Sequence, residues 1–343
     1  MTTKTKFSSY CINGIAEGCK HCIQGKKLVL FITGKCSRNC EYCSLSNLRK
    51  NKDDVWANER KSRSIKEIIK EVEESNADSA GITGGDPLLK IDRTIKYAKA
   101  LKDKFGEKFH IHIYLPTNLI TEDKIKRLSE VVDEIRIHPG FLRNAEKAEE
   151  DIEKIKLASK IIGKKNLGIE MPMFPDKEKE MLDFILSVKD YIDFVNLNEL
   201  ESSETNLDYI TSKYKLKEGG YIIDCSKEAG IKLLEDLEKE NVKLKVHLCT
   251  AETKNNYQYA NRLKIHNILP YGYKTKEGTV IYLTSEDKTL ADKYPRETYY
   301  DKDKERVILS EELAKKLLND YKIKKTEEFP TFDRIIVEEE YLN

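Results

Sequence analysis

Short apolar runs alternate with longer amphipathic segments through the first two hundred residues. The apolar runs predict six strands, at 26–34, 78–85, 108–116, 133–139, 166–174 and 193–200. The amphipathic segments predict helices at about 64–75, 91–104, 122–131, 146–162 and 177–190. Strands that alternate with helices in this way indicate an α/β fold with a parallel sheet. Such regular connections favour a partial (β/α)6 barrel over an open, doubly wound sheet.

The alternation stops after Glu201. The stretch SSETNLDYITSKYKLKEGGY (202–221) is polar and predicts a loop, after which a helix at about 226–240 and the strand KLKVHLC (243–249) return the chain to the main body. Beyond about Pro270, the strands at 279–285 and 334–342 and the helix at 310–321 predict a small α+β unit. We therefore expect an N-terminal cysteine-rich arm (1–25), a partial barrel (26–250) and a C-terminal extension (251–343).

Charge and hydropathy exclude several classes of protein. The 61 basic and 60 acidic residues give a net charge of +1, so no overall field attracts nucleic acid. The basic stretch LRKNK (48–52) lacks an aromatic stacking platform and is typical of a solvated loop. The N-terminus has no signal-peptide core, and no apolar run approaches the roughly 20 residues of a membrane span. These features predict a cytoplasmic protein with no membrane partner and no strong nucleic-acid signal.

Six of the eight cysteines fall within residues 11–43, which indicates metal binding rather than disulfides. Cys36, Cys40 and Cys43 form a CxxxCxxC motif directly after the first strand, where parallel barrels build active sites. A structural zinc needs four ligands. Three cysteines on an iron–sulfur cube instead leave one iron open for a substrate or cofactor. A zinc with a distant fourth ligand and three metal-free thiols remain as alternatives.

The motif CSRNCEYC (36–43), on an alternating β/α chain, resembles the radical S-adenosylmethionine (radical SAM) superfamily. The resemblance covers roughly residues 26–200. It implies that the three cysteines bind a 4Fe–4S cluster whose open iron chelates the amino and carboxylate groups of S-adenosylmethionine. It also implies that an electron from the cluster cleaves a carbon–sulfur bond and yields a 5′-deoxyadenosyl radical.

A second motif lies at the end of the second strand. Gly84-Gly85-Asp86-Pro87 resembles the family's Gly-Gly-Glu-Pro stretch, whose backbone binds the methionine amino group; an ordinary turn is the alternative. Glycine allows the backbone to approach a ligand closely. A bulky side chain at Gly85 is therefore expected to weaken S-adenosylmethionine binding and to leave the cluster in place. Tyr42 is expected to lie beside the open iron.

Polar residues at the ends of later strands complete the expected site. The resemblance implies that such residues hold the ribose and the carboxylate of S-adenosylmethionine, and the candidates are Asn118, Arg136 and Glu170, followed by Thr117, His138 and Met171. His138 also fits a satisfied core histidine. Asn198, Glu199 and Glu201 suit hydrogen bonding to a polar substrate, with solvated surface charges as the alternative.

The remaining cysteines pose a separate question. Cys11, Cys19 and Cys22 form a Cx7CxxC group ahead of the barrel, and Cys249 is the expected fourth ligand. Four thiolates suit a second iron–sulfur cluster or a structural zinc, and the absence of metal is the third alternative. His247 is an alternative ligand or supports one. Cys225, alone in IIDCSK, is expected to be inert.

Within the superfamily, the chain resembles a largely archaeal group related to pyruvate formate-lyase activating enzymes. GCKHCIQGKKLVLFITGKC (18–36), DVWANER (54–60) and NLNELESSETN (196–206) carry this resemblance. It implies a radical SAM enzyme with an electron donor such as ferredoxin or flavodoxin and a small-molecule, protein or RNA substrate. A glycyl-radical-enzyme activase is one alternative. A non-enzymatic iron–sulfur carrier is another, but carriers usually cap every iron with protein ligands.

Overall fold

The computed structural model describes residues 1–343, and a large, mainly parallel sheet carries the fold. Seven consecutive strands of this sheet are parallel: β3 (Lys27–Phe31), β6 (Ser79–Thr83), β7 (His110–Pro116), β8 (Glu134–His138), β9 (Leu167–Met173), β10 (Phe194–Glu199) and β11 (Lys245–Cys249). The six strands predicted from the alternation are all present. The later strand β11 extends the parallel run by one.

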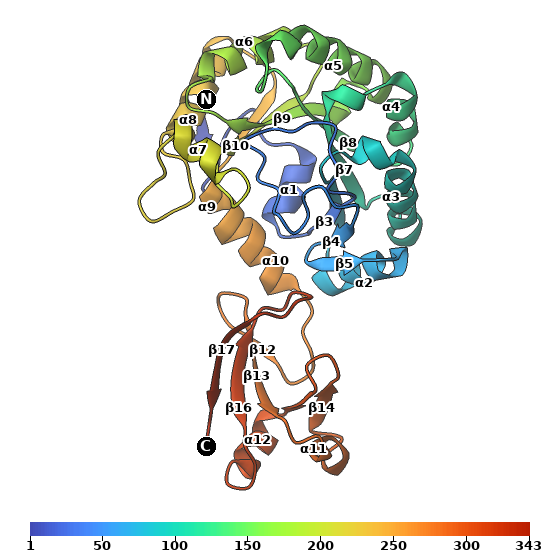
Figure 1. The fold of residues 1–343 in the computed structure, drawn as a ribbon, viewed down its shortest axis with the longest axis vertical. Coiled ribbons are helices and arrows are strands. Elements are labelled where there is room, and N and C mark those ends of the chain that lie inside the picture. The colour runs from blue at the N-terminus through green and yellow to red at the C-terminus, as the bar shows by residue number, and fades with distance from the viewer.

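Short antiparallel strands flank the seven parallel strands at both edges of the sheet. β2 (Tyr10–Ile12) pairs with β11 and is followed by β1 (Thr3–Lys4), while β4 (Val55–Ala57) pairs with β3 and is followed by β5 (Arg60–Ser62). The order is therefore β1-β2-β11-β10-β9-β8-β7-β6-β3-β4-β5. The two ends do not pair with each other, so the curved sheet in Figure 1 is an incomplete barrel.

Helices cover the outer face of the curved sheet (Figure 1). They are α2 (Ile65–Ser75), α3 (Ile91–Phe105), α4 (Glu122–Ser129), α5 (Ala148–Ile162), α6 (Glu178–Val188) and α8 (Ser226–Lys239). Ser64 begins α2 with a capping box, because its side chain accepts from the Glu67 amide while the Glu67 side chain reaches back. Alternation along each strand sends apolar side chains such as Leu28 and Leu30 towards the helices. The opposite face of each strand is left for the barrel interior.

The inner face is occupied by α1 (Glu17–Ile23), which lies within the arc of strands in Figure 1. Gly18 allows this helix to approach the strands closely. A Cβ at Gly18 would lie 2.6 Å from His112 Nδ1 and 2.8 Å from Arg136 Nη2. The first 25 residues thus extend the main sheet through β1 and β2 and fill part of its interior with α1.

The stretch 202–221, predicted to be a loop, contains a short helix, α7 (Leu207–Lys213). The prediction was wrong there because one fully buried side chain, Ile210, anchors the helix. A single buried position in seven residues gives no periodic signal. The rest of the stretch is irregular, with isolated bridges at Glu201 and Leu216.

The C-terminal residues form a second sheet with its own small core. Its strands are β12 (Tyr273–Lys274), β13 (Val280–Ser285), β14 (Thr298–Asp301), β15 (Arg306–Leu309), β16 (Lys324–Glu328) and β17 (Ile336–Tyr341), all antiparallel. Two helices, α11 (Thr289–Lys293) and α12 (Glu311–Leu317), accompany them. Sequence analysis anticipated β13, α12 and β17 but not the strands between them.

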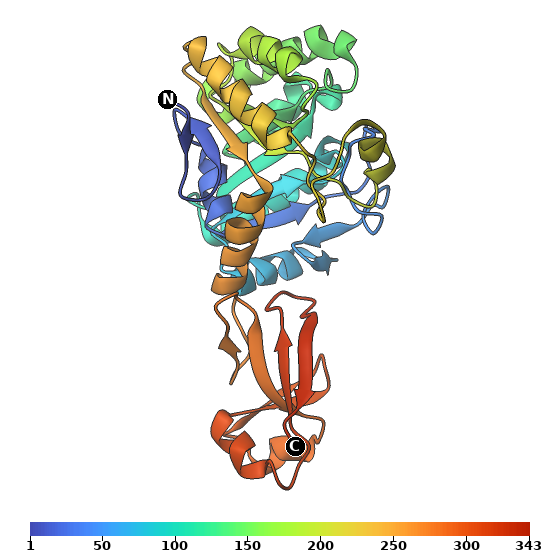
Figure 2. The ribbon, with the colours of Figure 1, turned by 90° about the vertical axis from the view of Figure 1, so that its left-hand side faces the viewer.

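A continuous helical segment joins the two sheets. It consists of α9 (Ala251–Thr253), the π-helix η5 (Lys254–Tyr259) and α10 (Ala260–Ile265). Figure 2 shows the C-terminal sheet beyond α10, well away from the barrel interior. Arg60 stacks on the Phe332 ring at 4.0 Å, and the Asn267 amide donates to the Glu74 carbonyl. These contacts fix the C-terminal unit against α2 and β5.

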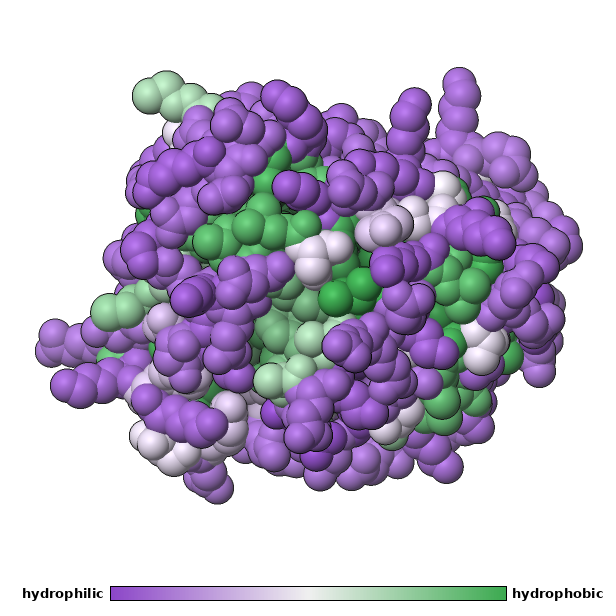
Figure 3. Space-filling model, turned by 90° about the horizontal axis from the view of Figure 1, so that it is seen from above, coloured by the Kyte–Doolittle hydropathy of each residue, from purple (hydrophilic) through white to green (hydrophobic).

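The surface at the end of the molecule opposite the C-terminal unit is mainly hydrophilic, with apolar atoms visible between polar side chains (Figure 3). None of the helices has the length and apolar character needed to cross a bilayer.

Candidate active site

A cavity of about 700 Å³ opens at the carboxyl ends of the parallel strands. The loop after β3, the glycine turn after β6 and the ends of the later strands all contribute to its wall. The sequence-predicted residues that line it are Cys36, Cys40, Tyr42, Cys43, Gly84, Gly85, Arg136, His138, Glu170, Met171, Asn198, Glu199 and Glu201. The parallel sheet therefore brings the cysteine motif, the glycine turn and the polar strand ends to one place.

The cysteine loop is held against the barrel by Ser37 and Arg38. Ser37 Oγ donates to Asp86 Oδ2 at 2.6 Å. Arg38 Nε donates to Asn118 Oδ1 at 2.5 Å, and its Nη1 donates to the His138 carbonyl at 2.9 Å. The ends of β6, β7 and β8 therefore position the cysteine loop.

The stretch after β10 holds the same loop from the other side. Thr205 Oγ1 donates to the Cys43 carbonyl at 2.9 Å, and the buried Asn206 donates from Nδ2 to the Tyr42 carbonyl at 3.0 Å. The Asn47 amide donates to Glu204 at 2.6 Å. Residues at the end of NLNELESSETN (196–206) thus hold the cysteine loop in place through hydrogen bonds.

The glycine turn lies directly against the cysteine loop. The Gly85 amide donates to the Thr33 carbonyl at 2.7 Å. A Cβ at Gly85 would lie 2.3 Å from the Lys35 carbonyl oxygen and 3.0 Å from Cys36 Cβ, and one at Gly84 would lie 2.6 Å from the Thr33 oxygen. This geometry argues against the expectation that a side chain at Gly85 leaves the cluster in place. Such a side chain collides first with the backbone next to Cys36.

Asp86 and Asn118 do not line the cavity wall. Asp86 is fully buried, accepts from Ser37 and from the Leu88 amide, and begins a short 3-10 helix, η1 (Pro87–Lys90). Burial raises the pKa of Asp86, and the Ser37 hydrogen bond opposes this shift. Asn118 contacts Arg38 rather than the cavity. Both residues form hydrogen bonds with the cysteine loop, so they influence the cavity by positioning that loop.

Arg136 and Glu170 form a buried ion pair in the barrel interior. Arg136 Nη1 lies 2.8 Å from Glu170 Oε2, Arg136 Nε donates to Glu134 at 2.6 Å, and Asn198 Nδ2 donates to Glu170 Oε1 at 2.9 Å. Burial acts to raise the pKa of Glu170, but the Arg136 charge and the Asn198 hydrogen bond outweigh it. The pKa of Glu170 is therefore lowered, and the carboxylate is ionised in the cavity wall.

His138 orients Tyr42. Its Nδ1 lies 3.1 Å from the Glu170 carbonyl, which can only accept, so Nδ1 carries the proton. Its Nε2 then accepts from the Tyr42 hydroxyl at 2.9 Å. Burial and the nearby Arg38 charge lower the pKa of His138 to about 4, so the ring is neutral at pH 7. The Tyr42 ring is held in place next to Cys43.

Sequence analysis missed three cations near or within the cavity. Arg38 lies within the cysteine motif, Lys27 begins β3 and Lys254 begins η5, where it pairs with Glu201 at 2.6 Å. Burial acts to lower the pKa of Lys27, but the charge of Cys22 raises it above the usual value. Alternation along β3 places Lys27 on the inner face of the sheet with Val29. This alternation was the one feature of the sequence that could have indicated a lysine in the cavity.

The N-terminal thiols lie inside the barrel. Cys19 and Cys249 are 5% and 4% exposed, while Cys11 and Cys22 are half-buried. Arg136 Nη2 donates to Cys19 Sγ at 3.4 Å, so Arg136 contacts both this group and the cavity wall. Burial raises the pKa of the Cys249 thiol to about 12. Cys225 is exposed and lies in the loop before α8.

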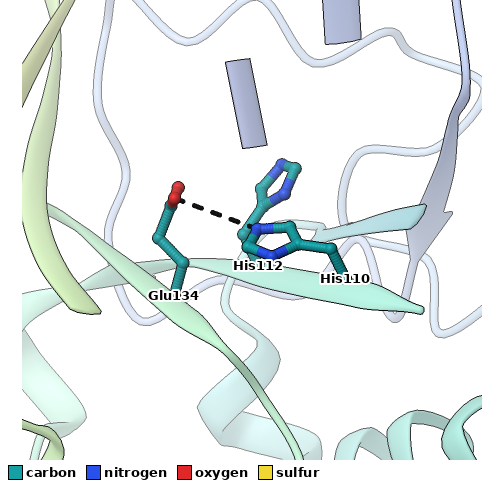
Figure 4. Close-up of side chains that lie close together, drawn as sticks. All are labelled: His110, His112 and Glu134. Carbon is teal, nitrogen blue, oxygen red and sulfur yellow. Dashed lines mark ion pairs between the residues drawn. The ribbon is translucent and has the colours of Figure 1, made fainter. Parts of the chain in front are cut away.

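His110, His112 and Glu134 come together near the amino ends of β7 and β8, with one potential ligand atom of each within 4.8 Å of the others (Figure 4). Glu134 already accepts from Arg136 and from the Gly18 amide. Burial and the Arg136 charge lower the pKa of His112 well below its usual value. The Arg136 charge would also repel a divalent cation. We therefore interpret His110, His112 and Glu134 as residues that pack beneath α1 and do not bind a metal.

The cavity offers a donor set that fits an iron–sulfur cluster. Three thiols from one loop face it, and their sulfur atoms do not all lie within 4.8 Å of one another. Thiolates on a single zinc lie about 3.8 Å apart, because each Zn–S bond is about 2.3 Å long. The three thiols therefore do not form a preassembled mononuclear zinc site, and three cysteines on one loop leave one iron of a cube open.

Comparisons with known proteins agree with this chemistry. A family model described as the radical SAM superfamily matches residues 30–186. A protein of Methanocaldococcus jannaschii named "Putative glycyl-radical enzyme activating enzyme" is 38% identical over an alignment of 283 residues. The match covers 78% of this chain and 72% of that protein.

Solved structures of anSMEcpe are also similar. The structure with bound AdoMet and Cp18Cys peptide matches 62% of this chain at 17% identity and a TM-score of 0.40, and the one with Kp18Cys peptide matches 65% at 16% and 0.41. This chain spans 59% and 63% of those two chains. The family model and the extensive identity to the M. jannaschii protein identify the family. The chain belongs to the radical SAM superfamily, whose enzymes carry a 4Fe–4S cluster and bind S-adenosylmethionine.

Proposed function

We propose that Cys36, Cys40 and Cys43 hold the 4Fe–4S cluster and that S-adenosylmethionine binds between it and the glycine turn. One observation carries the proposal: the three thiols and the Gly84-Gly85 backbone line the same cavity at the carboxyl ends of the strands. When bound, the cluster supplies the electron that cleaves S-adenosylmethionine to methionine and a 5′-deoxyadenosyl radical.

The chain's own residues shape the space for S-adenosylmethionine. The ionised Glu170, fixed by Arg136 and Asn198, provides acceptor oxygens for ribose hydroxyls. Arg136 provides a buried positive charge on the same wall. The neutral His138 keeps Tyr42 beside the cysteine loop, and Tyr42 is itself nearly buried. These groups bind and orient the ligand and exclude water, which protects a radical from side reactions.

The proposed substrate is a glycyl-radical enzyme, from which the radical takes a hydrogen atom at a glycine Cα. The name of the M. jannaschii relative supports this choice. The cavity wall also offers a donor and acceptors of the kind that a peptide backbone needs, because Lys254, Glu199 and Glu201 all line it. A ferredoxin or flavodoxin is the proposed electron donor.

The proposal is tested with anaerobically reconstituted protein, dithionite, S-adenosylmethionine and a glycine-rich peptide deuterated at the glycine Cα. We expect 5′-deoxyadenosine and methionine, with deuterium transferred into the 5′-deoxyadenosine. Mass spectrometry measures both products. A protein that binds iron and accepts electrons but releases neither product would instead be an electron carrier. Release without deuterium from the peptide, but with label from a small molecule, would contradict the protein substrate.

A further inference from the structure

Four thiols outside the CxxxCxxC motif converge on the barrel interior. Cys19 and Cys22 are three residues apart on α1, so they share one side of that helix. β2 pairs with β11 in a register that sets Cys11 directly opposite His247, and directly opposed residues lie on the same face. Cys249 lies two residues beyond His247 on the same strand and therefore on the same face.

His247 of β11 and Cys19 of α1 share one hydrogen-bond partner, Asn196 of β10. Its Nδ1 lies 2.7 Å from Asn196 Oδ1, and the Cys19 thiol lies 3.5 Å from the same oxygen. The histidine is 2% exposed, and its Nε2 has no hydrogen-bond partner. Buried polar atoms are normally satisfied. An unpartnered imidazole nitrogen among buried thiols therefore points to a missing ligand.

We propose that Cys11, Cys19, Cys22 and Cys249 bind a second iron–sulfur cluster. His247 lies next to it as an alternative ligand through Nε2, which is unprotonated because Nδ1 donates to Asn196 Oδ1. This site is separate from the three-cysteine cavity and does not depend on the substrate proposed above. With four thiolates, every iron of a cube is capped, so the cluster has no open iron. Its expected role is to fix α1 in the barrel and to store or pass electrons next to the cavity.

The spacing of the thiols does not match a preformed zinc site. A zinc bound by four thiolates requires sulfur atoms about 3.8 Å apart, from its bond length of about 2.3 Å. No three of these four sulfur atoms lie within 4.8 Å of one another. The four thiols therefore do not form a preassembled mononuclear zinc site.

The surrounding charges suit the same occupant. A cubane cluster with four thiolate ligands carries net negative charge, which is costly in a buried site without nearby cations. Arg136 Nη2 lies 3.4 Å from Cys19 Sγ, and Lys27 interacts with Cys22. Gln258 donates to Cys249 Sγ at 3.1 Å, a hydrogen bond typical of those that tune cluster thiolates. These contacts give the buried Arg136 and the half-buried Lys27 a role that the first cavity alone does not explain.

Metal content in three variants of the full chain tests the proposal. We expect the anaerobically reconstituted parent to hold about eight irons and eight sulfides, two 4Fe–4S clusters. The Cys36→Ala/Cys40→Ala/Cys43→Ala variant should keep about four irons, and its reduced EPR signal should not change on addition of S-adenosylmethionine. The Cys19→Ser/Cys249→Ser variant, which preserves side-chain volume, should lose about four irons and keep a signal that does respond. Cys225→Ala is the matched control and should equal the parent.

Several outcomes would overturn the proposal. A triple-alanine variant with no iron, or with one zinc per chain, would show that these thiols do not hold a cluster. A Cys19→Ser/Cys249→Ser variant with the parent's iron count would do the same. Failure of the parent to cleave S-adenosylmethionine would count against the proposed function only, since the iron of the triple variant reports on the second site alone.

Discussion

Alanine at Cys36, Cys40 or Cys43 is expected to reduce the release of 5′-deoxyadenosine to the background of the assay. Each thiol occupies a different position on the loop after β3, and all three line the cavity. No other cysteine lines this cavity, so no neighbouring thiol is in place to substitute. Chromatography and mass spectrometry of the reduced, reconstituted variants with S-adenosylmethionine measure the loss.

Cys225→Ala is the appropriate control for these variants. Cys225 is exposed, lies before α8 and does not line the cavity, so its removal should leave the product unchanged. A Cys36→Ala/Cys40→Ala/Cys43→Ala variant that forms the parent's amount of 5′-deoxyadenosine would contradict the assignment of these thiols.

Gly85→Ala is expected to lose most of the first cluster and with it S-adenosylmethionine cleavage. The new Cβ would lie 2.3 Å from the Lys35 carbonyl oxygen, so the backbone that leads into Cys36 must move. Overpacking of this kind typically costs about 1–3 kcal/mol, and here the strain falls on the ligand loop. Iron and sulfide counts, together with the EPR response to S-adenosylmethionine, report the loss.

Gly220→Ala provides a matched substitution at a glycine with free space. A Cβ there meets no atom closer than 3.7 Å, and its backbone is not in the left-handed region. We expect its cluster content and product formation to equal those of the parent. If Gly85→Ala retains the parent's iron content and only S-adenosylmethionine binding weakens, the collision with the cysteine loop does not govern this site.

The parallel half of the fold was predictable because its signals are local. Each buried strand is an apolar run, and each covering helix has an amphipathic period between two such runs. β2 and β4 are only three residues long, and their pairing with distant strands leaves no local pattern. The same holds for β15, whose buried run Arg306–Leu309 becomes a strand through pairing with β13 and β14.

The site was predictable to the extent that it is a motif. The spacing of Cys36, Cys40 and Cys43 predicted them as ligands, and the glycine turn was proposed from its place after a strand; both line the same cavity. The roles of Arg38, Lys27 and Lys254 arise only when the sheet brings distant segments together, and a lysine at the start of a strand usually indicates solvent. Asp86 and Asn118 were predicted to contact the cofactor, but their side chains bond to Ser37 and Arg38 of the cysteine loop and do not line the cavity.

The position of the N-terminal cysteines was beyond sequence analysis for a physical reason. The CxxC spacing shows that two thiols share a side of a helix but not what that side faces. The close approach of α1 to His112 and Arg136 depends on Gly18, a residue that carries no chemistry of its own. The cysteine-rich arm precedes the barrel in the sequence, but in space its helix α1 lies within the barrel.

The most direct test of the central assignment is electron–nuclear double resonance on the reduced protein with isotopically labelled S-adenosylmethionine. If the cluster held by Cys36, Cys40 and Cys43 has an open iron in the cavity, the label in the methionine amino nitrogen and carboxylate oxygen will couple to the cluster spin. The coupling should persist in Cys19→Ser/Cys249→Ser and disappear in the variant with alanine at all three motif cysteines. A reduced cluster in the parent protein that shows no coupling to either label at saturating S-adenosylmethionine would contradict the account.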